Sequence, residues 1–121
     1  MSKNTEDKHL QMVLQLAKPG IDIITDLTAN RANLLHMAVG VAGEAGELLD
    51  AVKKHAIYNK PIDYNNVVEE LGDLEFYMAG VRAALSIARE DTLRCNMEKL
   101  AKRYPNFQYT NERAQKRADK E

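Results

Sequence analysis

The chain has 121 residues, enough for one domain with its own hydrophobic core and too few for several. Acidic and basic residues nearly cancel, 18 against 17, so no overall charge favours a nucleic-acid polymer or a membrane surface. A single cysteine, Cys95, excludes an internal disulfide, and the charged N-terminal sequence lacks a secretory signal. Glu44, Glu47 and Asp50 interrupt the least polar stretch, so no membrane span is expected. These features predict a soluble, cytoplasmic protein.

Helical periodicity dominates the sequence, whereas strand signals are poor. Caps, prolines and glycines divide it into four expected helices, at residues 6–17, 30–57, 64–88 and 90–104. Thr28 and Asp63 are the expected N-caps of the second and third helices. Residues 21–28 are ambiguous between helix and loop. We expect a single all-α domain over residues 1–110, resembling a four-helix bundle completed by oligomerisation, and a flexible polar tail over residues 111–121.

Two pairs of acidic residues lie in weakly polar surroundings, Glu44 with Glu47 and Glu70 with Asp73. The members of each pair are three residues apart, which places both side chains on one face of a helix. If the two helices pack antiparallel, four carboxylates meet at one point. Carboxylate oxygens suit Mg²⁺ or Mn²⁺, and such an ion can neutralise a phosphate-bearing substrate and activate a water. The pattern predicts metal-dependent phosphate chemistry.

A solvated helix surface is the alternative interpretation of Glu44 and Glu47. The same helix carries three internal glycines, Gly40, Gly43 and Gly46. Each glycine costs about 1 kcal/mol relative to alanine, so we expect another group to approach the backbone closely there.

At about 100° per residue, the long second helix divides into two faces. One is expected to pack and carries Leu34, Val41, Ala45, Leu48 and Val52. The other is expected to carry the chemistry and includes His36, Gly40, Glu44, Glu47, Ala51 and Lys54.

Polar and cationic residues on the last helix are candidate substrate contacts. Asn96, Lys99 and Arg103 share one stripe, and such cations suit a polyphosphate. Favourable placement of cations at a helix C-terminus is the alternative explanation. Lys53 and Lys54 follow the first acid pair and can reach a phosphate, although alone they are ordinary surface lysines.

Three runs of sequence resemble the successive signatures of the MazG-like nucleoside triphosphate pyrophosphohydrolases, a family of the all-α NTP pyrophosphatase superfamily. They are GEAGELLDAVKK at residues 43–54, EELGDLEFY at 69–77 and NMEKLAKRYPNF at 96–107. Each run alone is a weak signal, but three in the right order over residues 34–107 are specific.

The resemblance implies a Mg²⁺-dependent homodimer or homotetramer that cleaves an NTP or dNTP to the monophosphate and pyrophosphate. The implied metal ligands are Glu44, Glu47, Glu70 and Asp73. The implied substrate contacts are Lys53, Lys54, Asn96, Lys99 and Arg103. His36 is a further candidate substrate contact and is not expected to bind metal, because no second histidine lies at ligand spacing. No motif matches before residue 34, so base recognition is unassigned.

The expected mechanism is attack on phosphorus by a metal-activated water, with Glu47 the favoured general base and Glu44 the second catalytic carboxylate. One alternative keeps the fold with dUTP, dCTP or a modified nucleotide as substrate. A non-catalytic helical interaction module is another. A di-iron bundle needs two Glu-x-x-His pairs, and the chain has only Glu6 with His9.

Overall fold

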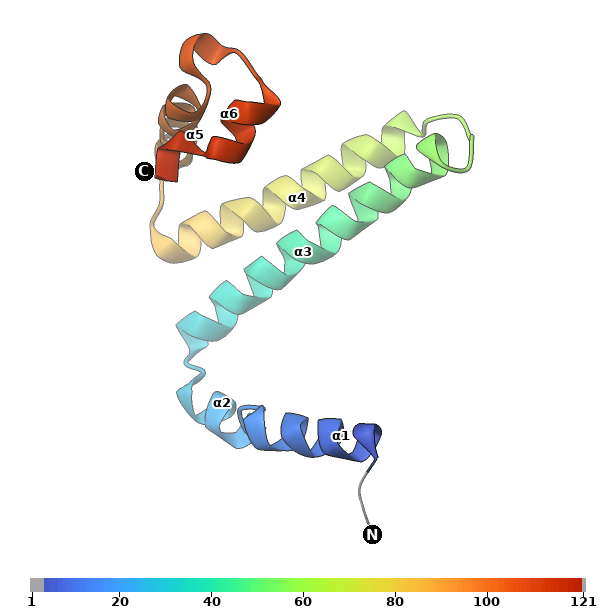
Figure 1. Cartoon of the computed structure of the whole chain (residues 1–121), viewed down its shortest axis with the longest axis vertical. Coiled ribbons are helices and arrows are strands. Elements are labelled where there is room, and N and C mark those ends of the chain that lie inside the picture. Colours follow the sequence, from blue (N-terminus) through green and yellow to red (C-terminus); the bar gives the residue numbers. More distant parts are fainter. Residues whose placement is uncertain (1–3, 121) are drawn as a thin grey trace. The chain divides into compact units, whose positions relative to one another are not determined.

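The computed structural model describes residues 4–120, and within this range all regular structure is helical (Figure 1). The elements are α1 (Thr5–Leu16), α2 (Gly20–Asp26), α3 (Ala29–Ala56), α4 (Tyr64–Leu85), α5 (Arg89–Arg103), η1 (Pro105–Phe107), α6 (Asn111–Lys116) and η2 (Ala118–Lys120). The expected all-α class is confirmed. Residues 1–3 and 121, which belong to the expected domain and tail, lie outside the described residues.

The chain divides into two compact units, Met1–Ala32 and Asn33–Glu121. The expected single domain over residues 1–110 stays a prediction. In the first unit, Asn4 caps α1, its Oδ1 accepting a hydrogen bond from the Asp7 amide at 2.8 Å. The ambiguous segment after Pro19 forms the short helix α2. Its Thr25 hydroxyl donates to the Ile21 carbonyl at 2.7 Å.

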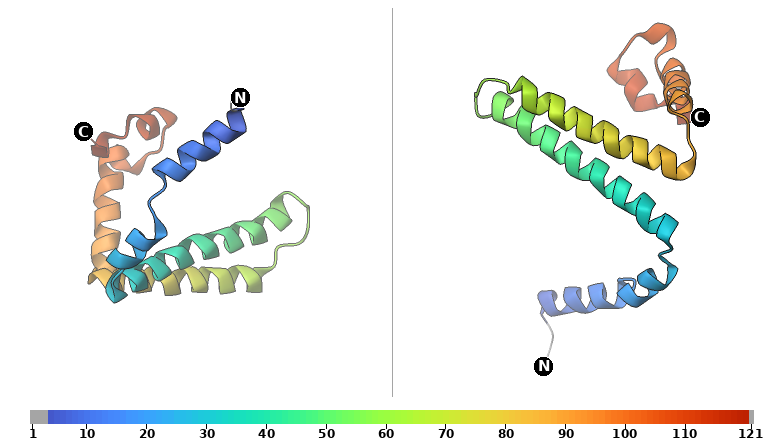
Figure 2. Two further views of the ribbon diagram at one scale, coloured as in Figure 1. Left: turned by 90° about the horizontal axis from the view of Figure 1, so that it is seen from below. Right: turned by 180° about the vertical axis from the view of Figure 1, so that it is seen from behind.

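Helix α3 begins in the first unit and continues from Asn33 into the second, where α3 and α4 run antiparallel side by side, joined by the loop at residues 57–63 (Figures 1 and 2). Both expected caps are confirmed. Thr28 Oγ1 accepts from the Arg31 amide at 3.3 Å, and Asp63 Oδ1 accepts from the Asn66 amide at 3.1 Å. Helix α4 ends at Leu85, earlier than expected, because Ser86 has a left-handed backbone with φ 55°.

Two glycines allow α3 and α4 to approach closely. A Cβ at Gly40 would overlap the ring of Tyr77, and one at Gly80 would overlap the side chain of Met37. The expectation of close approach is therefore confirmed at Gly40. It is wrong at Gly43 and Gly46 within this chain, where an added Cβ meets no atom within 4 Å.

The acid-bearing face of α3 is also the face that packs on α4. Gly40 meets Tyr77 there, and Glu44 meets carboxylates of α4. On the same face, Ala51 is 7% exposed and is the one buried hydrophobic residue within residues 4–120. The expected separation into a packing face and a chemical face is therefore wrong. Small residues on this face let a neighbouring helix come near, so it packs and holds the acids together.

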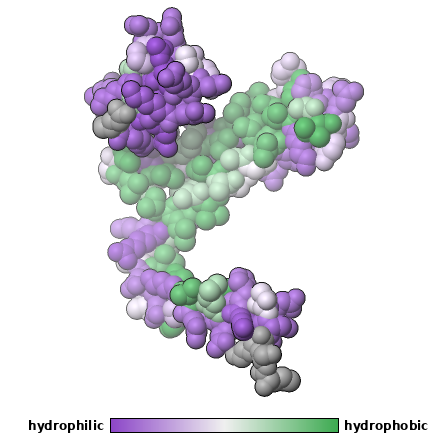
Figure 3. All heavy atoms as spheres, in the orientation of Figure 1, coloured by the Kyte–Doolittle hydropathy of each residue, from purple (hydrophilic) through white to green (hydrophobic). Residues whose placement is uncertain are grey.

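Much of the apolar surface of α3 and α4 is uncovered. The most exposed large residues on these two helices are Tyr64, 75%, Leu49 and Val68, both 67%, and Phe76, 65%. Figure 3 shows hydrophobic residues gathered over these helices. Among the described helices, none combines the length and apolar character needed to cross a membrane.

The C-terminal residues that the sequence predicts as a flexible tail contain α6 and η2. Thr110 caps α6, its Oγ1 accepting from the Arg113 amide at 3.1 Å. Helix η2 is held against α5 by an ion pair between Arg103 and Asp119. Polar composition alone does not reveal a local cap or an ion pair between distant residues, which is why the sequence missed this structure.

Candidate functional site

Three carboxylates meet between α3 and α4. One oxygen each from Glu44, Glu70 and Asp73 lie within 4.8 Å of one another, with Glu44 and Glu70 half-buried and Asp73 exposed. Glu70 and Asp73 stand one turn apart on α4, and the antiparallel α3 brings Glu44 opposite them. Oxygens on opposite sides of a bound Mg²⁺ are separated by about 4.2 Å, which is comparable to the spacing of this cluster.

Glu47, the fourth acid, is exposed on α3 and is not one of the three clustered ligand groups. It is nevertheless close enough for its charge to raise the pKa of Glu70. The structure thus brings three of the expected ligands together and leaves Glu47 at their border. Its part in metal binding stays a prediction.

Glu70 has unfavourable electrostatic surroundings, as its hydrogen bonding and its pKa both show. Its Oε2 is buried and has no hydrogen-bond partner among the described residues. Its pKa is raised from 4.5 to about 7, first by a proton shared with the Glu44 carboxyl, then by burial, and then by the charges of Glu44, Asp73 and Glu47. A divalent cation would give the unpartnered oxygen a ligand bond and neutralise the repulsion. The residues present therefore fit a hard cation with oxygen ligands.

Tyr77 lies one helical turn from Asp73 on α4, and His36 lies about two turns from Glu44 on α3. The His36 ring meets Tyr77 edge-on, with centroids 6.2 Å apart, and Phe76 contacts the same tyrosine at 5.1 Å. The ring contact of His36 is with Tyr77, and its role toward substrate stays a prediction. Tyr77 had no assigned role in the sequence, although Gly40 opposite it was a signal that a ring approaches the helix.

Both lysines at the end of α3 already have partners. Lys54 Nζ lies 3.1 Å from Asp50 Oδ2, and Lys53 Nζ lies 5.3 Å from the centroid of the Tyr58 ring. The Lys54 pair is half exposed, so it is weak and can be exchanged for a phosphate at little cost.

The three candidates on α5 have different surroundings. Asn96 is exposed, and Lys99 lines a hollow next to the C-terminal segment. Arg103 donates from Nε to Asp119 Oδ1 at 2.9 Å. This contact raises the pKa of Arg103 and lowers that of Asp119, because each charge stabilises the other. The partner of Arg103 could not be read from the sequence, since it lies 16 residues away on a different helix.

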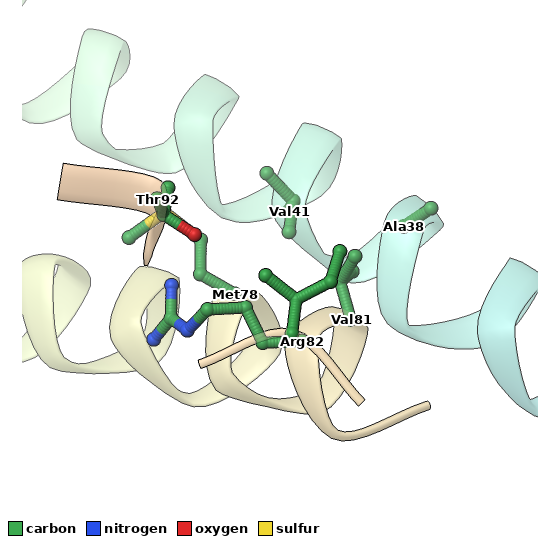
Figure 4. Close-up of a pocket in the computed structure, with 7 residues that line it drawn as sticks. Ala38, Val41, Met78, Val81, Arg82 and Thr92 are labelled. Atoms are coloured by element: carbon green, nitrogen blue, oxygen red, sulfur yellow. The ribbon is translucent and has the colours of Figure 1, made fainter. Parts of the chain in front are cut away.

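An apolar hollow of about 410 Å³ lies between α3, α4 and the start of α5 (Figure 4). Its lining includes Ala38, Val41, Met78, Val81, Arg82 and Thr92. None of the clustered acids lines it. The hollow therefore belongs with the uncovered apolar surface of these helices and not with the carboxylates.

Comparison with known families gives one match. Residues 33–108 match the MazG nucleotide pyrophosphohydrolase domain, a range that includes the carboxylate cluster and all of α5. No match was found among curated proteins or among solved structures. The matched range covers more than half of the chain and confirms the resemblance of the three sequence runs. The chain belongs to the MazG nucleotide pyrophosphohydrolase family.

Proposed function

We propose that this protein is a Mg²⁺-dependent hydrolase that cleaves an NTP or dNTP to the nucleoside monophosphate and pyrophosphate. Membership of the family supports nucleotide pyrophosphohydrolase activity in general. The observation that carries the metal dependence is Glu70 Oε2, buried and without a partner inside a cluster of three carboxylates. A bound cation would give this oxygen a ligand bond and offset the repulsion between the neighbouring carboxylates.

The proposed reaction needs residues that bind the metal, accept a proton and contact the phosphates. Glu44, Glu70 and Asp73 would hold the metal, and Glu47 at their border would join them. Bound Mg²⁺, or Mn²⁺, would supply charge neutralisation and a lowered pKa for the attacking water. Glu47 is exposed, so its carboxylate can receive the proton of that water, with Glu44 as the second catalytic carboxylate. Polyphosphate contacts would come from Lys53, Lys54, Asn96, Lys99 and Arg103, and a further substrate contact from His36.

The narrower alternatives differ in substrate or in class. Preference for dUTP, dCTP or a modified nucleotide keeps the same site. An interaction module without catalysis would bind its partner equally well without metal. The di-iron alternative has little support, because the cluster contains no histidine and the only Glu-x-x-His pair, Glu6 with His9, lies on α1 in the other unit.

The test is release of pyrophosphate from a panel of NTPs and dNTPs, with Mg²⁺, with Mn²⁺ and with chelator. We expect pyrophosphate and a monophosphate as the first products, and no turnover with chelator. A nucleoside diphosphate and inorganic phosphate as first products would contradict attack at the α-phosphorus. Bound iron without nucleotide turnover would favour the di-iron alternative.

We also propose that the protein acts as a homodimer or homotetramer in the cytoplasm. The exposed apolar residues of α3 and α4, such as Leu49, support assembly, because water-exposed apolar area of this extent marks an interface. Light scattering should report a dimer or tetramer at micromolar concentration and a smaller species for Leu49→Asp. A monomeric wild type would contradict the assembly.

A further inference from the structure

The ion pair between Arg103 and Asp119 leaves the arginine partly unsatisfied. The two side chains are only 16% and 4% exposed, and the bond uses Arg103 Nε and Asp119 Oδ1. Arg103 Nη2 is buried and has no hydrogen-bond partner within residues 4–120. A guanidinium presents its donors as a fork that suits two acceptor oxygens at once. Asp119 therefore uses the Nε donor of the guanidinium and leaves the Nη2 donor without a partner.

Asp119 also borders a cationic hollow. The hollow has a volume of about 260 Å³ and is lined by Cys95, Glu98, Lys99, Lys102, Asp119 and Lys120. Three lysines face two acids there, and one of those acids is already paired with Arg103. The charge left in the hollow favours an anion with several oxygens.

We propose that this hollow binds the polyphosphate of a nucleotide and that Asp119 is a built-in competitor for Arg103. With Asp119 in place, Arg103 is withheld from the ligand. A phosphate group brings more charge and more oxygens than a carboxylate, so it can displace Asp119 and use Nη2 as well as Nε. The identity of the natural ligand as a nucleoside triphosphate rests on the proposed function.

Competition of this kind lowers apparent affinity without changing the contacts to the ligand. The observed dissociation constant equals the intrinsic one divided by the fraction of molecules in which Arg103 is free. If that fraction is about one tenth, removing the competing charge strengthens binding roughly tenfold. If the ion pair only anchors η2, removing it leaves the affinity unchanged or weakens it.

The experiment measures binding of inorganic triphosphate to the full-length protein by calorimetry. Asp119→Asn should bind roughly tenfold more tightly than the wild type. The matched control is Glu112→Gln, which removes one negative charge from exposed α6 without touching Arg103. It should bind within about twofold of the wild type. Equal or weaker binding by Asp119→Asn, the same gain in both variants, or no binding to any of the proteins would overturn the proposal.

A second measurement uses the wild type alone and so does not depend on how the variant folds. Inorganic triphosphate should speed amide hydrogen exchange in residues 118–120, because displaced Asp119 no longer holds η2 on α5. Unchanged or slower exchange there would overturn the competition.

Measuring pyrophosphate release separates the competition at Arg103 from the proposed enzyme activity. A wild type that hydrolyses nucleotide while Asp119→Asn shows no gain in binding refutes only the competitor. A protein that shows the gain but hydrolyses no nucleotide refutes only the enzyme.

Discussion

The carboxylate cluster and the basic region of α5 are opposite electrostatic cases. Between α3 and α4, like charges are held together, and the described residues supply no cation for Glu70. On α5, the part-buried Arg103 is neutralised by Asp119 from the same chain. The acidic region therefore carries uncompensated negative charge until a cation binds, whereas the charge of Arg103 is already neutralised by Asp119, although its Nη2 still has no hydrogen-bond partner among the described residues.

This contrast appears in the pKa values. Repulsion and burial raise the pKa of Glu70 to about 7, whereas attraction to Arg103 lowers the pKa of Asp119. Raising the pH to neutrality charges Glu70 and so works against the fold. Lowering the pH below the ordinary range of aspartate removes the charge of Asp119 and breaks its ion pair. The two regions should therefore respond to pH in opposite directions.

The largest effect should come from removing a clustered acid. Glu70→Gln and Glu44→Gln should each lower nucleotide hydrolysis on the order of 100-fold, because each takes away a proposed metal ligand. Steady-state pyrophosphate release measures this loss. The matched control is Glu75→Gln, an exposed acid on α4 outside the cluster, which should keep wild-type activity. Equal losses of hydrolysis in all three variants would mean that activity depends on the general surface charge and not on the cluster.

A smaller effect is expected from the basic region. Arg103→Ala should raise KM for nucleotide roughly tenfold, because it removes a charge-assisted contact to phosphate. Its affinity for Mg²⁺ without nucleotide should be unchanged. Arg94→Ala is the control, since Arg94 is also on α5 and also paired, with Asp91, but is exposed. Wild-type kinetics for Arg103→Ala would show that the arginine only holds η2 against α5 through Asp119 and does not contact substrate.

The metal-free protein should lose stability as the pH rises from about 4.5 to about 7. The pKa of Glu70 is higher in the folded chain than in the unfolded chain, so the folded state holds more protons in this window. Thermal melting in chelator across this range measures the slope. Glu70→Gln should flatten it. A wild type whose stability increases steadily through the same window would mean that Glu70 titrates normally.

The smallest effect concerns the exposed pair between Asp50 and Lys54. Asp50→Asn should lower the free energy of unfolding by only about 0.3–0.5 kcal/mol, as for other exposed pairs one helical turn apart. Chemical denaturation gives this value. If Lys54 binds phosphate, the variant should also bind nucleotide slightly better. Weaker nucleotide binding would indicate that the pair positions Lys54.

The sequence predicted the parts of this molecule that depend on local signals. Thr28 and Asp63 begin their helices as expected because a cap acts over three residues. The acids of α4 reach one cluster because their spacing follows the helical repeat. The partner of Arg103, the exposure of Glu47 outside the cluster and the structure of α6 were not predicted. The first two depend on how separate elements pack, which periodicity does not encode, and α6 begins at a local cap, Thr110, that polar composition alone did not reveal.

The most direct test of the carboxylate cluster as a metal site is thermal melting of the nucleotide-free wild type, Glu70→Gln and Glu47→Gln with Mg²⁺ and with chelator. A ligand that binds only the folded state stabilises it, by about 2.7 kcal/mol at a hundred times its dissociation constant, or roughly 10 °C for a domain of this size. We predict this rise for the wild type and a much smaller one for both variants. In chelator, both variants should be at least as stable as the wild type, because each removes one repelling charge. The same response to Mg²⁺ in all three proteins would contradict a metal site between α3 and α4.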